Sequence, residues 1–396
     1  MRVLIITNRY PAGADDTASP FVPHFVAALQ ACGVIVDVLT PDYGRTEDDE
    51  QAVVHRFRTG ATVPVGSWNL RSPVTWWRLW RFWRNAMTAG RRLCRMHHYD
   101  HILALWALPS GRLARKLGRK FGIPYSVWCL GSDIYVWARR RLIRGQIARV
   151  LRNAACVFAD GEDLCERVHS SFGVACRFLP SFRPLPDLYT GALPHATEMP
   201  HFLYLGRIHR AKGVYELAQA FLRVRDRLPG ATLRFVGEGP EVENLRRAIG
   251  LPISSGVIRI DGPLDHAGLI DALQECDFVV IPSQSDSLPL VFSEAVQANR
   301  PVIGTDVGDL GRFIRRYRVG AVTQSLEPRD LAATMIDMAR APVFDEWGRD
   351  ELLRLLDPTR AAERFCVGVL GSRPPANRVP GPQSADQART TARRSG

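Results

Sequence analysis

Two cations and two carboxylates in the second half of the sequence have the chemistry to bind a phosphorylated sugar. Arg207 and Lys212 lie in the segment GRIHRAKG, and Asp286 and Glu294 lie in the stretch from Phe278 to Leu310. Arginine offers a planar fork of donors and lysine a point charge, and together they suit a departing diphosphate. Carboxylates repel phosphate but accept hydrogen bonds from paired hydroxyls. These residue types therefore indicate a nucleotide sugar as the ligand.

The stretch from Phe278 to Leu310 predicts a strand, a polar loop, a helix, a turn and a second strand. Phe278 to Ile281 is short and apolar enough for a buried parallel strand. Pro289 suits a first helical turn, and we expect the helix to continue from Leu290 to Ala298 before a strand at Val302 to Thr305. Free amides at the start of this helix favour an anion, so we place a phosphate there. The candidate donor-binding residues are Leu288, Pro289, Leu290 and Val291.

Plainer interpretations of these residues stay open at this point. Glu294 would then be a solvated helix residue, and Asp286 would form an Asx-turn in a loop. A second motif, G-x-G at Gly237 and Gly239, lacks the third glycine of a dinucleotide fingerprint because Val242 stands there. That departure argues against an NAD enzyme.

The stretch resembles the hallmark of glycosyltransferase family 4, a retaining family with the GT-B fold. In that α/β fold, two Rossmann-like doubly wound domains face a central cleft. The residues that carry the resemblance include Pro282, Ser283, Pro289, Leu290, Glu294, Ala295, Pro301 and Val302. Asp286 stands where the family has the first glutamate of a pair, and Ser287 and Asn299 replace glycines. GRIHRAKG is similar to the family element that contains a Gly-Arg pair and a Lys-Gly pair.

The resemblance implies transfer of a hexose from a nucleoside-diphosphate sugar with retained anomeric configuration. Glu294 would hold the ribose diol and Asp286 the sugar, while Arg207 and Lys212, beside Gly206, would hold the leaving diphosphate. We expect UDP as the nucleotide, with GDP second, and a lipid-linked or polysaccharide acceptor. The chain contains no Asp-x-Asp sequence. We therefore expect a metal-independent transferase with no cofactor beyond the donor.

Two other functions stay open on these residues. One is a catalytically weak scaffold that binds nucleotide sugars, because several family residues are replaced. The other is a nucleotide-sugar epimerase. A phosphorylase is excluded, since it would need a lysine for pyridoxal phosphate and Lys212 is the only lysine of the second half.

Two segments of the first half also resemble the family. RYPAGADDTASPFV is similar to its phosphate-facing glycine loop, in which Gly13 is retained and Ser19 stands at the second glycine. The segment from Asp100 to Asp133 is similar to a second conserved region, but Leu130 replaces a histidine that lies at the donor sugar in the family. We keep the Leu130 backbone carbonyl as a donor contact. Asp133 favours a helix cap, with direct donor contact as the alternative.

An unusual segment between Glu50 and Asp100 contains nine arginines, five tryptophans and no acidic residue. At helical spacing one face contains Trp76, Leu79, Trp80, Trp83 and Met87, and another contains Arg78, Arg81, Arg84 and Asn85. Such a helix is typical of binding to an anionic membrane surface, and Trp68 and Trp77 add to it. A helix whose tryptophans pack in a core is the alternative. Nucleic acid is disfavoured because no nucleic-acid-binding motif accompanies the segment.

Length, charge and hydropathy suggest two domains. The chain has 396 residues, more than one core normally supports. Residues 1–195 hold 26 Lys and Arg against 15 Asp and Glu, whereas residues 196–396 hold 26 against 25. We expect an acceptor-side domain at 1–190, a nucleotide-sugar domain at 196–345, closing helices at 346–370 that return to the first domain, and a disordered tail at 371–396.

We expect a cytoplasmic protein that is peripheral on the inner membrane. No run is long enough to span a bilayer, and the apolar residues after Met1 predict a first strand instead of a signal peptide. The eight cysteines form no C-x-x-C pair, so we expect them to be reduced.

Overall fold

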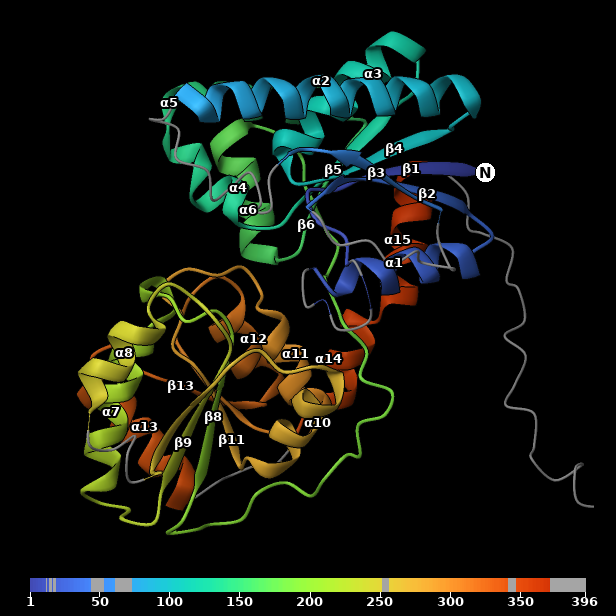
Figure 1. Cartoon of the computed structure of the whole chain (residues 1–396). Coiled ribbons are helices and arrows are strands. Elements are labelled where there is room, and N and C mark those ends of the chain that lie inside the picture. Colours follow the sequence, from blue (N-terminus) through green and yellow to red (C-terminus); the bar gives the residue numbers. More distant parts are fainter. Residues whose placement is uncertain are drawn as a thin grey trace, which may run out of the picture.

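The computed structural model describes residues 1–11, 13, 16, 19–43, 53–60, 73–250, 256–340 and 347–370, and these form two separate parallel β-sheets (Figure 1). The first sheet has the order β3-β2-β1-β4-β5-β6-β7, and every neighbouring pair is parallel. Its strands are β1 (Arg2–Ile6), β2 (Ile35–Asp42), β3 (Val53–Arg58), β4 (His101–Leu105), β5 (Tyr125–Cys129), β6 (Cys156–Ala159) and β7 (Arg177–Phe178).

The second sheet repeats this winding in the order β10-β9-β8-β11-β12-β13, again with parallel neighbours. Its strands are β8 (His201–Leu205), β9 (Thr232–Val236), β10 (Ile258–Asp261), β11 (Phe278–Ile281), β12 (Val302–Gly304) and β13 (Gly320–Val322). Short runs of branched apolar residues bounded by polar loops form these strands, as expected for sheets covered on both faces. The predicted doubly wound α/β fold is confirmed.

Helices cover both faces of the first sheet (Figure 1). Two helices distant in sequence, α1 (Phe21–Ala31) and α15 (Pro358–Leu370), pack together on one face through Phe25 and Phe365. The opposite face is covered by α2 (Pro73–Met96), α3 (Arg112–Phe121), α5 (Arg141–Leu151) and α6 (Glu162–Phe172), and the short α4 (Ser132–Tyr135) follows β5. The last described helix thus closes the chain onto the first domain.

The second sheet is covered in the same way. One face carries α7 (Val214–Arg225), α8 (Val242–Ile249) and α13 (Pro328–Arg340). The other carries α10 (His266–Glu275), α11 (Leu290–Gln297), α12 (Leu310–Tyr317) and α14 (Arg349–Leu356). Of the two closing helices predicted to return to the first domain, α14 packs against the second domain instead, and α15 packs against the first. The expected tail at 371–396 lies outside the described residues.

The strand order fixes where a ligand can bind. In each sheet the winding reverses beside the first strand, between β1 and β4 and between β8 and β11. Ligands of doubly wound sheets bind at such switch points, outside the carboxyl ends of the strands. The loops that follow β8 and β11 therefore carry the site of the second domain, and they contain GRIHRAKG and the segment around Asp286.

Two glycines of the second domain serve packing between loops. A Cβ on Gly237 would lie 2.0 Å from the carbonyl oxygen of Gly206, and one on Gly239 would lie 2.1 Å from that of Ile208. The backbone amide of Ile208 donates to the carbonyl oxygen of Glu238 at 2.8 Å. The two glycines of the G-x-G sequence thus let the loop after β9 pack closely against the loop that carries Arg207. This packing accounts for both glycines, so the motif does not require a bound dinucleotide.

We predict that Gly237→Ala lowers the free energy of unfolding by about 3 kcal/mol, because the new Cβ overlaps backbone. Gly122→Ala is the control: Gly122 has φ +71 with nothing within 4 Å of its Cβ position, so only left-handed strain of about 1 kcal/mol is added. Urea unfolding followed by circular dichroism measures both. Equal losses would contradict this account of the interlocked loops.

Candidate functional site

Lys212 and Asp286 meet at the switch point of the second sheet. Lys212 lies in the loop after β8, and its Nζ is 2.6 Å from both carboxylate oxygens of Asp286, which follows β11. Gly213 permits this approach: it has φ +68, and a Cβ there would lie 1.9 Å from the carbonyl oxygen of Pro282. Two residues 74 positions apart are thereby fixed at one point of the cleft.

Arg207 lies in the same loop as Lys212 and is exposed. The Tyr204 hydroxyl donates to the Arg207 carbonyl oxygen at 2.8 Å, which fixes the backbone while the guanidinium faces solvent. Gly206 has φ +147, a conformation that residues with side chains rarely adopt, so the chain can turn out of β8 at this position. Of the two basic residues predicted to bind the diphosphate, Lys212 is thus held in an ion pair and Arg207 is exposed.

The amino end of α11 lies next to Asp286. Pro289 occupies the N-cap position and provides no side-chain cap, so Leu290 and Val291 begin the helix without one. The first amides of a helix have no intrahelical acceptor, and the dipole favours an anion there. Leu288 is buried beneath them, and Leu290 packs against the core of the first domain. The predicted phosphate position therefore faces the cleft.

Glu294 is buried one turn into α11, with only 9% of its side chain exposed. The interpretation of Glu294 as a solvated helix residue is therefore wrong. Arg183 Nη1 lies 3.5 Å from Glu294 Oε1 and is its ion-pair partner. Burial raises the pKa of Glu294 above its usual range, and the guanidinium of Arg183 partly opposes this rise.

The first domain presents its own loops to this site. Leu130 is half-buried after β5, and Gly131 follows with φ +92. Asp133 is not the predicted helix cap, because Gly131 occupies the N-cap of α4 and Asp133 lies inside the helix. Its Oδ2 instead accepts from the Ala107 amide at 2.8 Å, and burial raises its pKa to about 6. Asp133 thus joins α4 to the segment that follows β4.

The glycine-loop candidates lie after β1. Gly13 is half-buried and its carbonyl oxygen accepts from the Asp16 amide at 3.1 Å. Ser19 has φ +56, the left-handed region that favours glycine. Its backbone therefore keeps the conformation expected of the glycine it replaces, and its carbonyl oxygen accepts from Val22 at the start of α1.

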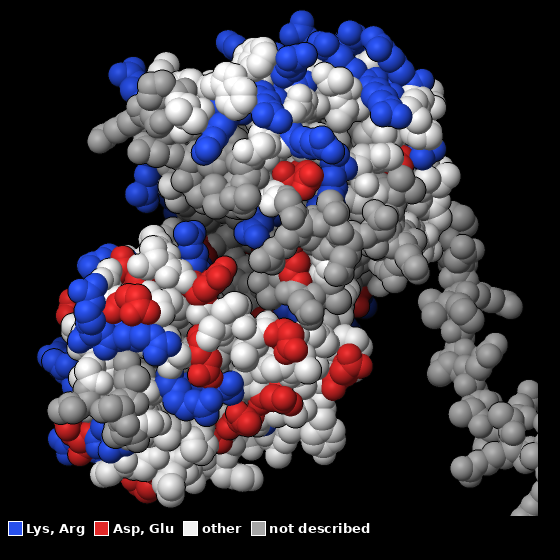
Figure 2. Space-filling model, viewed as in Figure 1, with Lys and Arg blue, Asp and Glu red and all other residues white. Residues whose placement is uncertain are grey.

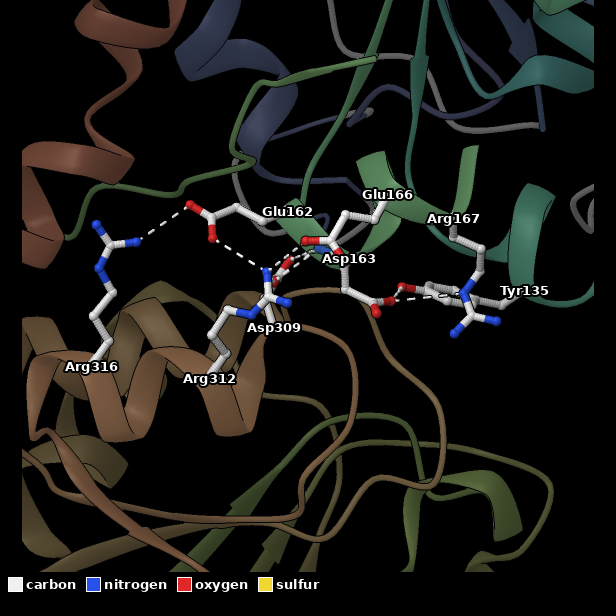
Figure 3. Close-up of polar contacts among 8 residues, drawn as sticks. All are labelled: Tyr135, Glu162, Asp163, Glu166, Arg167, Asp309, Arg312 and Arg316. Atoms are coloured by element: carbon white, nitrogen blue, oxygen red, sulfur yellow. Dashed lines mark hydrogen bonds and ion pairs between the residues drawn. The ribbon is translucent and has the colours of Figure 1, made fainter. Parts of the chain in front are cut away.

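A polar seam joins the domains beside these loops (Figure 3). Asp309, at the N-cap of α12, is fully buried, and the Asp163 amide at the start of α6 donates to both its carboxylate oxygens at 3.0 and 3.1 Å. Arg312 Nη1 lies 3.4 Å from Glu162 Oε2 and 3.2 Å from Glu166 Oε1. Gly161 permits the contact, because a Cβ there would lie 2.2 Å from Asp309 Oδ2.

Further buried acids lie behind this seam. Asp160, at the end of β6, is buried beside Ser287 of the second domain. Burial raises the pKa of Asp160 to about 8 and that of Asp309 to about 6, and the neighbouring carboxyls add to the rise at Asp160. Asp160 is therefore mostly protonated at neutral pH, which limits repulsion among the acids. Sequence reasoning missed both residues, although each follows a strand at its carboxyl end.

The predicted aromatic and basic helix is α2, and its exposed surface is basic (Figure 2). Trp76, Trp77 and Trp80 are 62%, 55% and 57% exposed. The predicted single tryptophan face is wrong in part, because Trp83 is half-buried and Met87 is buried against the core of the first domain. The alternative, with all the tryptophans in the core, is equally wrong. Trp68 lies outside the described residues.

Cations stack on these indoles instead of occupying a separate face. Arg81 lies over Trp77 at 5.5 Å and Arg84 over Trp80 at 5.4 Å, measured to the ring centroids. Trp83 is covered from α3, and the cations over its ring are Arg112 at 4.9 Å and Lys116 at 5.1 Å. Arg78 is exposed on α2. A surface of exposed indoles and guanidinium groups thus spans α2 and α3.

Neither a membrane span nor a metal site occurs in the part of the chain that the structure describes. None of its helices is long and apolar enough to cross a bilayer. No group of three or more His, Cys, Asp or Glu side chains is arranged there to hold a metal ion. All eight cysteines are free.

Comparisons with known proteins match this architecture. Residues 199–341 match the family model described as "Glycosyl transferases group 1", and residues 17–179 match the "Glycosyl transferase 4-like domain". The chain therefore belongs to the group 1 glycosyltransferases, family 4 enzymes with the GT-B fold.

Individual relatives support this assignment. A glycogen synthase of Mycobacterium tuberculosis is 30% identical over 96% of this chain and 98% of its own length. A D-inositol 3-phosphate glycosyltransferase of Pseudarthrobacter chlorophenolicus is 32% identical over 49% of each chain. Among solved structures, sucrose-phosphate synthase from Thermosynechococcus elongatus has a TM-score of 0.74 at 21% identity, covering 92% of this chain and 97% of that one. Anabaena HepE in complex with UDP-glucose has a TM-score of 0.68 at 14% identity, covering 94% and 100%.

We predict that Asp309→Ala opens the seam, because the Asp163 amide loses its acceptor and the start of α6 loses a buried anion. Small-angle X-ray scattering should show a larger radius of gyration for the nucleotide-free variant. Arg315→Ala is the control, since Arg315 pairs with Asp306 inside the second domain and lies on the same helix. An unchanged radius for Asp309→Ala would contradict the assigned role of the seam.

Proposed function

We propose that this glycosyltransferase transfers a hexose from a nucleoside-diphosphate sugar with retained anomeric configuration. The observation that carries the proposal is the Lys212–Asp286 pair, 2.6 Å apart at the switch point, in which Asp286 immediately precedes the segment that leads into α11 and the buried Glu294. A cation, an open helix start and two carboxylates at one sheet edge suit a diphosphate flanked by two diols.

Each residue of the pair has a separate task once the donor binds. Lys212 and Asp286 keep 31% and 19% of their side chains exposed. Both side chains thus remain partly accessible to solvent, so a bound diphosphate can reach the ammonium and compete for it with the single charge of Asp286. Lys212 then turns to the phosphate, and Asp286 is released to accept a hydroxyl of the sugar.

Charge development favours departure of the nucleotide. The diphosphate gains negative charge as the glycosidic bond breaks, and Arg207, Lys212 and the start of α11 lie where that charge grows. The acceptor hydroxyl attacks from the same face, and its proton passes to the departing phosphate. Glu294 keeps hold of the ribose diol throughout, and the transfer uses neither a metal nor another cofactor.

UDP is the proposed nucleotide, with GDP second. The neighbouring HepE structures are described as complexes with UDP, UDP with glucose, and UDP-glucose, and a trehalose-6-phosphate structure as bound with UDP-2-fluoro glucose. These names support a uridine donor for a chain of the same fold. The carboxylates of Asp286 and Glu294 bind hydroxyl groups of the donor, and backbone groups contact the nucleobase.

The acceptor is proposed to be lipid-linked or a polysaccharide at the cytoplasmic face of the membrane. The exposed indoles of α2 and the cations stacked on them suit the boundary between water and anionic headgroups. Each basic residue near an anionic leaflet contributes about 1 kcal/mol, so four or five of them suffice for reversible docking. Docking through α2 leaves the second domain free to bind the donor.

Calorimetric titration with UDP and GDP tests the donor site. We predict that Lys212→Ala and Glu294→Ala each weaken nucleotide binding about tenfold to a hundredfold, because each removes a charged hydrogen-bonding group. Arg223→Ala, on the exposed face of α7, is the control and should bind as the unmodified protein does. Absence of binding to both nucleotides, or unchanged binding in both site variants, would refute the proposed function.

Flotation with liposomes tests the membrane surface. We predict that the protein floats with anionic vesicles and not with neutral ones, and that Arg78→Glu with Arg81→Glu abolishes recovery. The matched control reverses two exposed arginines of the second domain, Arg223→Glu with Arg329→Glu, and should still float. Equal recovery on both vesicles, or undiminished binding by the α2 variant, would contradict membrane docking through α2.

A further inference from the structure

The segment that connects the domains is fixed along α11. Gln297 Nε2 donates to the Arg183 carbonyl oxygen at 3.0 Å, and its Oε1 accepts from the Leu185 amide at 2.9 Å. Asn299 Nδ2 donates to the Gly191 carbonyl oxygen at 3.0 Å. The connecting segment is therefore held against the helix that carries Glu294, and its backbone position does not depend on the Arg183 side chain.

The Arg183 side chain extends from this segment into the site. Its Nη1 lies 3.5 Å from Glu294 Oε1, and its Nη2 lies 3.1 Å from His266 Nδ1 at the start of α10. Only 13% of the Arg183 side chain is exposed. His266 Nε2 lies 3.4 Å from Asp187, which belongs to the same connecting segment. The guanidinium thus joins the two helices that border this part of the cleft.

Titratable and charged groups of three elements face this guanidinium. Glu294 comes from α11, His266 from α10, and His24 from α1 of the first domain. Burial and the neighbouring charge of Arg183 both lower the pKa of His24, so the imidazole is neutral near pH 7. Arg183 is therefore the cationic partner of Glu294. It also lies near His24 of the first domain.

The carboxylate at Glu294 needs such a partner. A buried carboxyl tends to take up a proton, and a bound diphosphate nearby adds negative charge that strengthens this tendency. A protonated carboxyl offers one hydrogen-bond donor where a ribose diol needs acceptors. Burial raises the pKa of Glu294 and Arg183 lowers it, so removal of the guanidinium would move the protonation of Glu294 towards neutral pH.

We propose that Arg183 is a positioning residue through which the connecting segment holds the Glu294 carboxylate ready for the ribose diol. The inference rests on the proposed function, because it takes Glu294 as the ribose acceptor. It adds that nucleotide affinity depends on a residue of the segment that connects the domains. Movement of the connecting segment would then change how tightly the donor is held.

Calorimetric titration with UDP from about pH 4 to about pH 8 tests this, since the range brackets an ordinary and a raised glutamate pKa. The unmodified protein should lose affinity only at the acid end. Arg183→Gln should bind about tenfold more weakly at neutral pH, and its loss of affinity should begin about one pH unit higher. Arg183→Lys keeps the charge and should retain the original pH profile, with a smaller loss of affinity because it lacks the planar fork.

Gln297→Ala separates this role from simple anchoring. It removes the hydrogen bonds that fix the connecting segment but leaves the guanidinium, so it should lower stability without moving the pH profile. Circular dichroism checks the folding of each variant. If Arg183→Gln does not fold, Arg183→Lys provides the test, and a pH profile shifted from that of the unmodified protein would overturn the inference.

The outcomes distinguish this inference from the proposed function. The inference is overturned if the pH profile of Arg183→Gln is unshifted, or if Gln297→Ala shifts the profile as far as Arg183→Gln does. In either case, UDP binding by the unmodified protein still supports the proposed function. Absence of UDP and GDP binding by the unmodified protein overturns both. A shifted profile in Arg183→Gln alone supports the positioning role.

Discussion

The buried carboxylate of Asp309 at the amino end of α6 is the contact on which the geometry of the cleft depends. A carboxylate that accepts from backbone amides at a helix start is stabilised by the helix dipole by up to about 2 kcal/mol when partly buried. Removal of such an anion from water costs several kcal/mol unless partners compensate. Here the Asp163 amide and the nearby Arg312 supply that compensation. The contact therefore requires the two domains to stay face to face.

The same contact positions the loop that we propose to bind the donor sugar. The Asp309 amide donates to the Ser287 carbonyl oxygen at 3.0 Å, and a Cβ on Gly308 would lie 2.2 Å from the carbonyl oxygen of Asp286. The loop from Asp286 to Ser287 is thus packed directly against the residue that joins the domains. Domain opening would move Asp286 relative to Gly131, whose Cβ position is 3.5 Å from Ser287. The backbone contacts around Asp309 thus link the position of this loop to the contact between the domains.

Much of the fold was predictable from the sequence, because its signals are local. The short apolar strands, the proline at the start of α11 and the loops after β8 and β11 place Arg207, Lys212, Asp286 and Glu294 at one sheet edge. Contacts between residues distant in sequence were not predictable, since no local pattern records them. The Asp163 amide meets Asp309 across 146 positions. Arg183 meets Glu294 from a segment that looks like an ordinary proline-rich linker.

Errors in the prediction of α2 and Asp133 have a common cause. Helical spacing gives the angle of a side chain around its helix but not which neighbour lies beside it. Trp83 falls on the predicted aromatic face, yet α3 packs over it and places Arg112 and Lys116 on its ring. Asp133 has the residue type of a helix cap, yet the Ala107 amide of a neighbouring loop is the donor that its carboxylate meets. Tertiary contacts decided both positions.

A crystal structure of the protein with bound UDP would show where the nucleotide lies. We predict the diphosphate at the amides of Leu290 and Val291 within hydrogen-bonding distance of Lys212, and the ribose hydroxyls on Glu294. We also predict that Lys212 no longer pairs with Asp286 in this complex. A nucleotide bound elsewhere, or a ribose without contact to Glu294, would show that the proposed donor site is wrong.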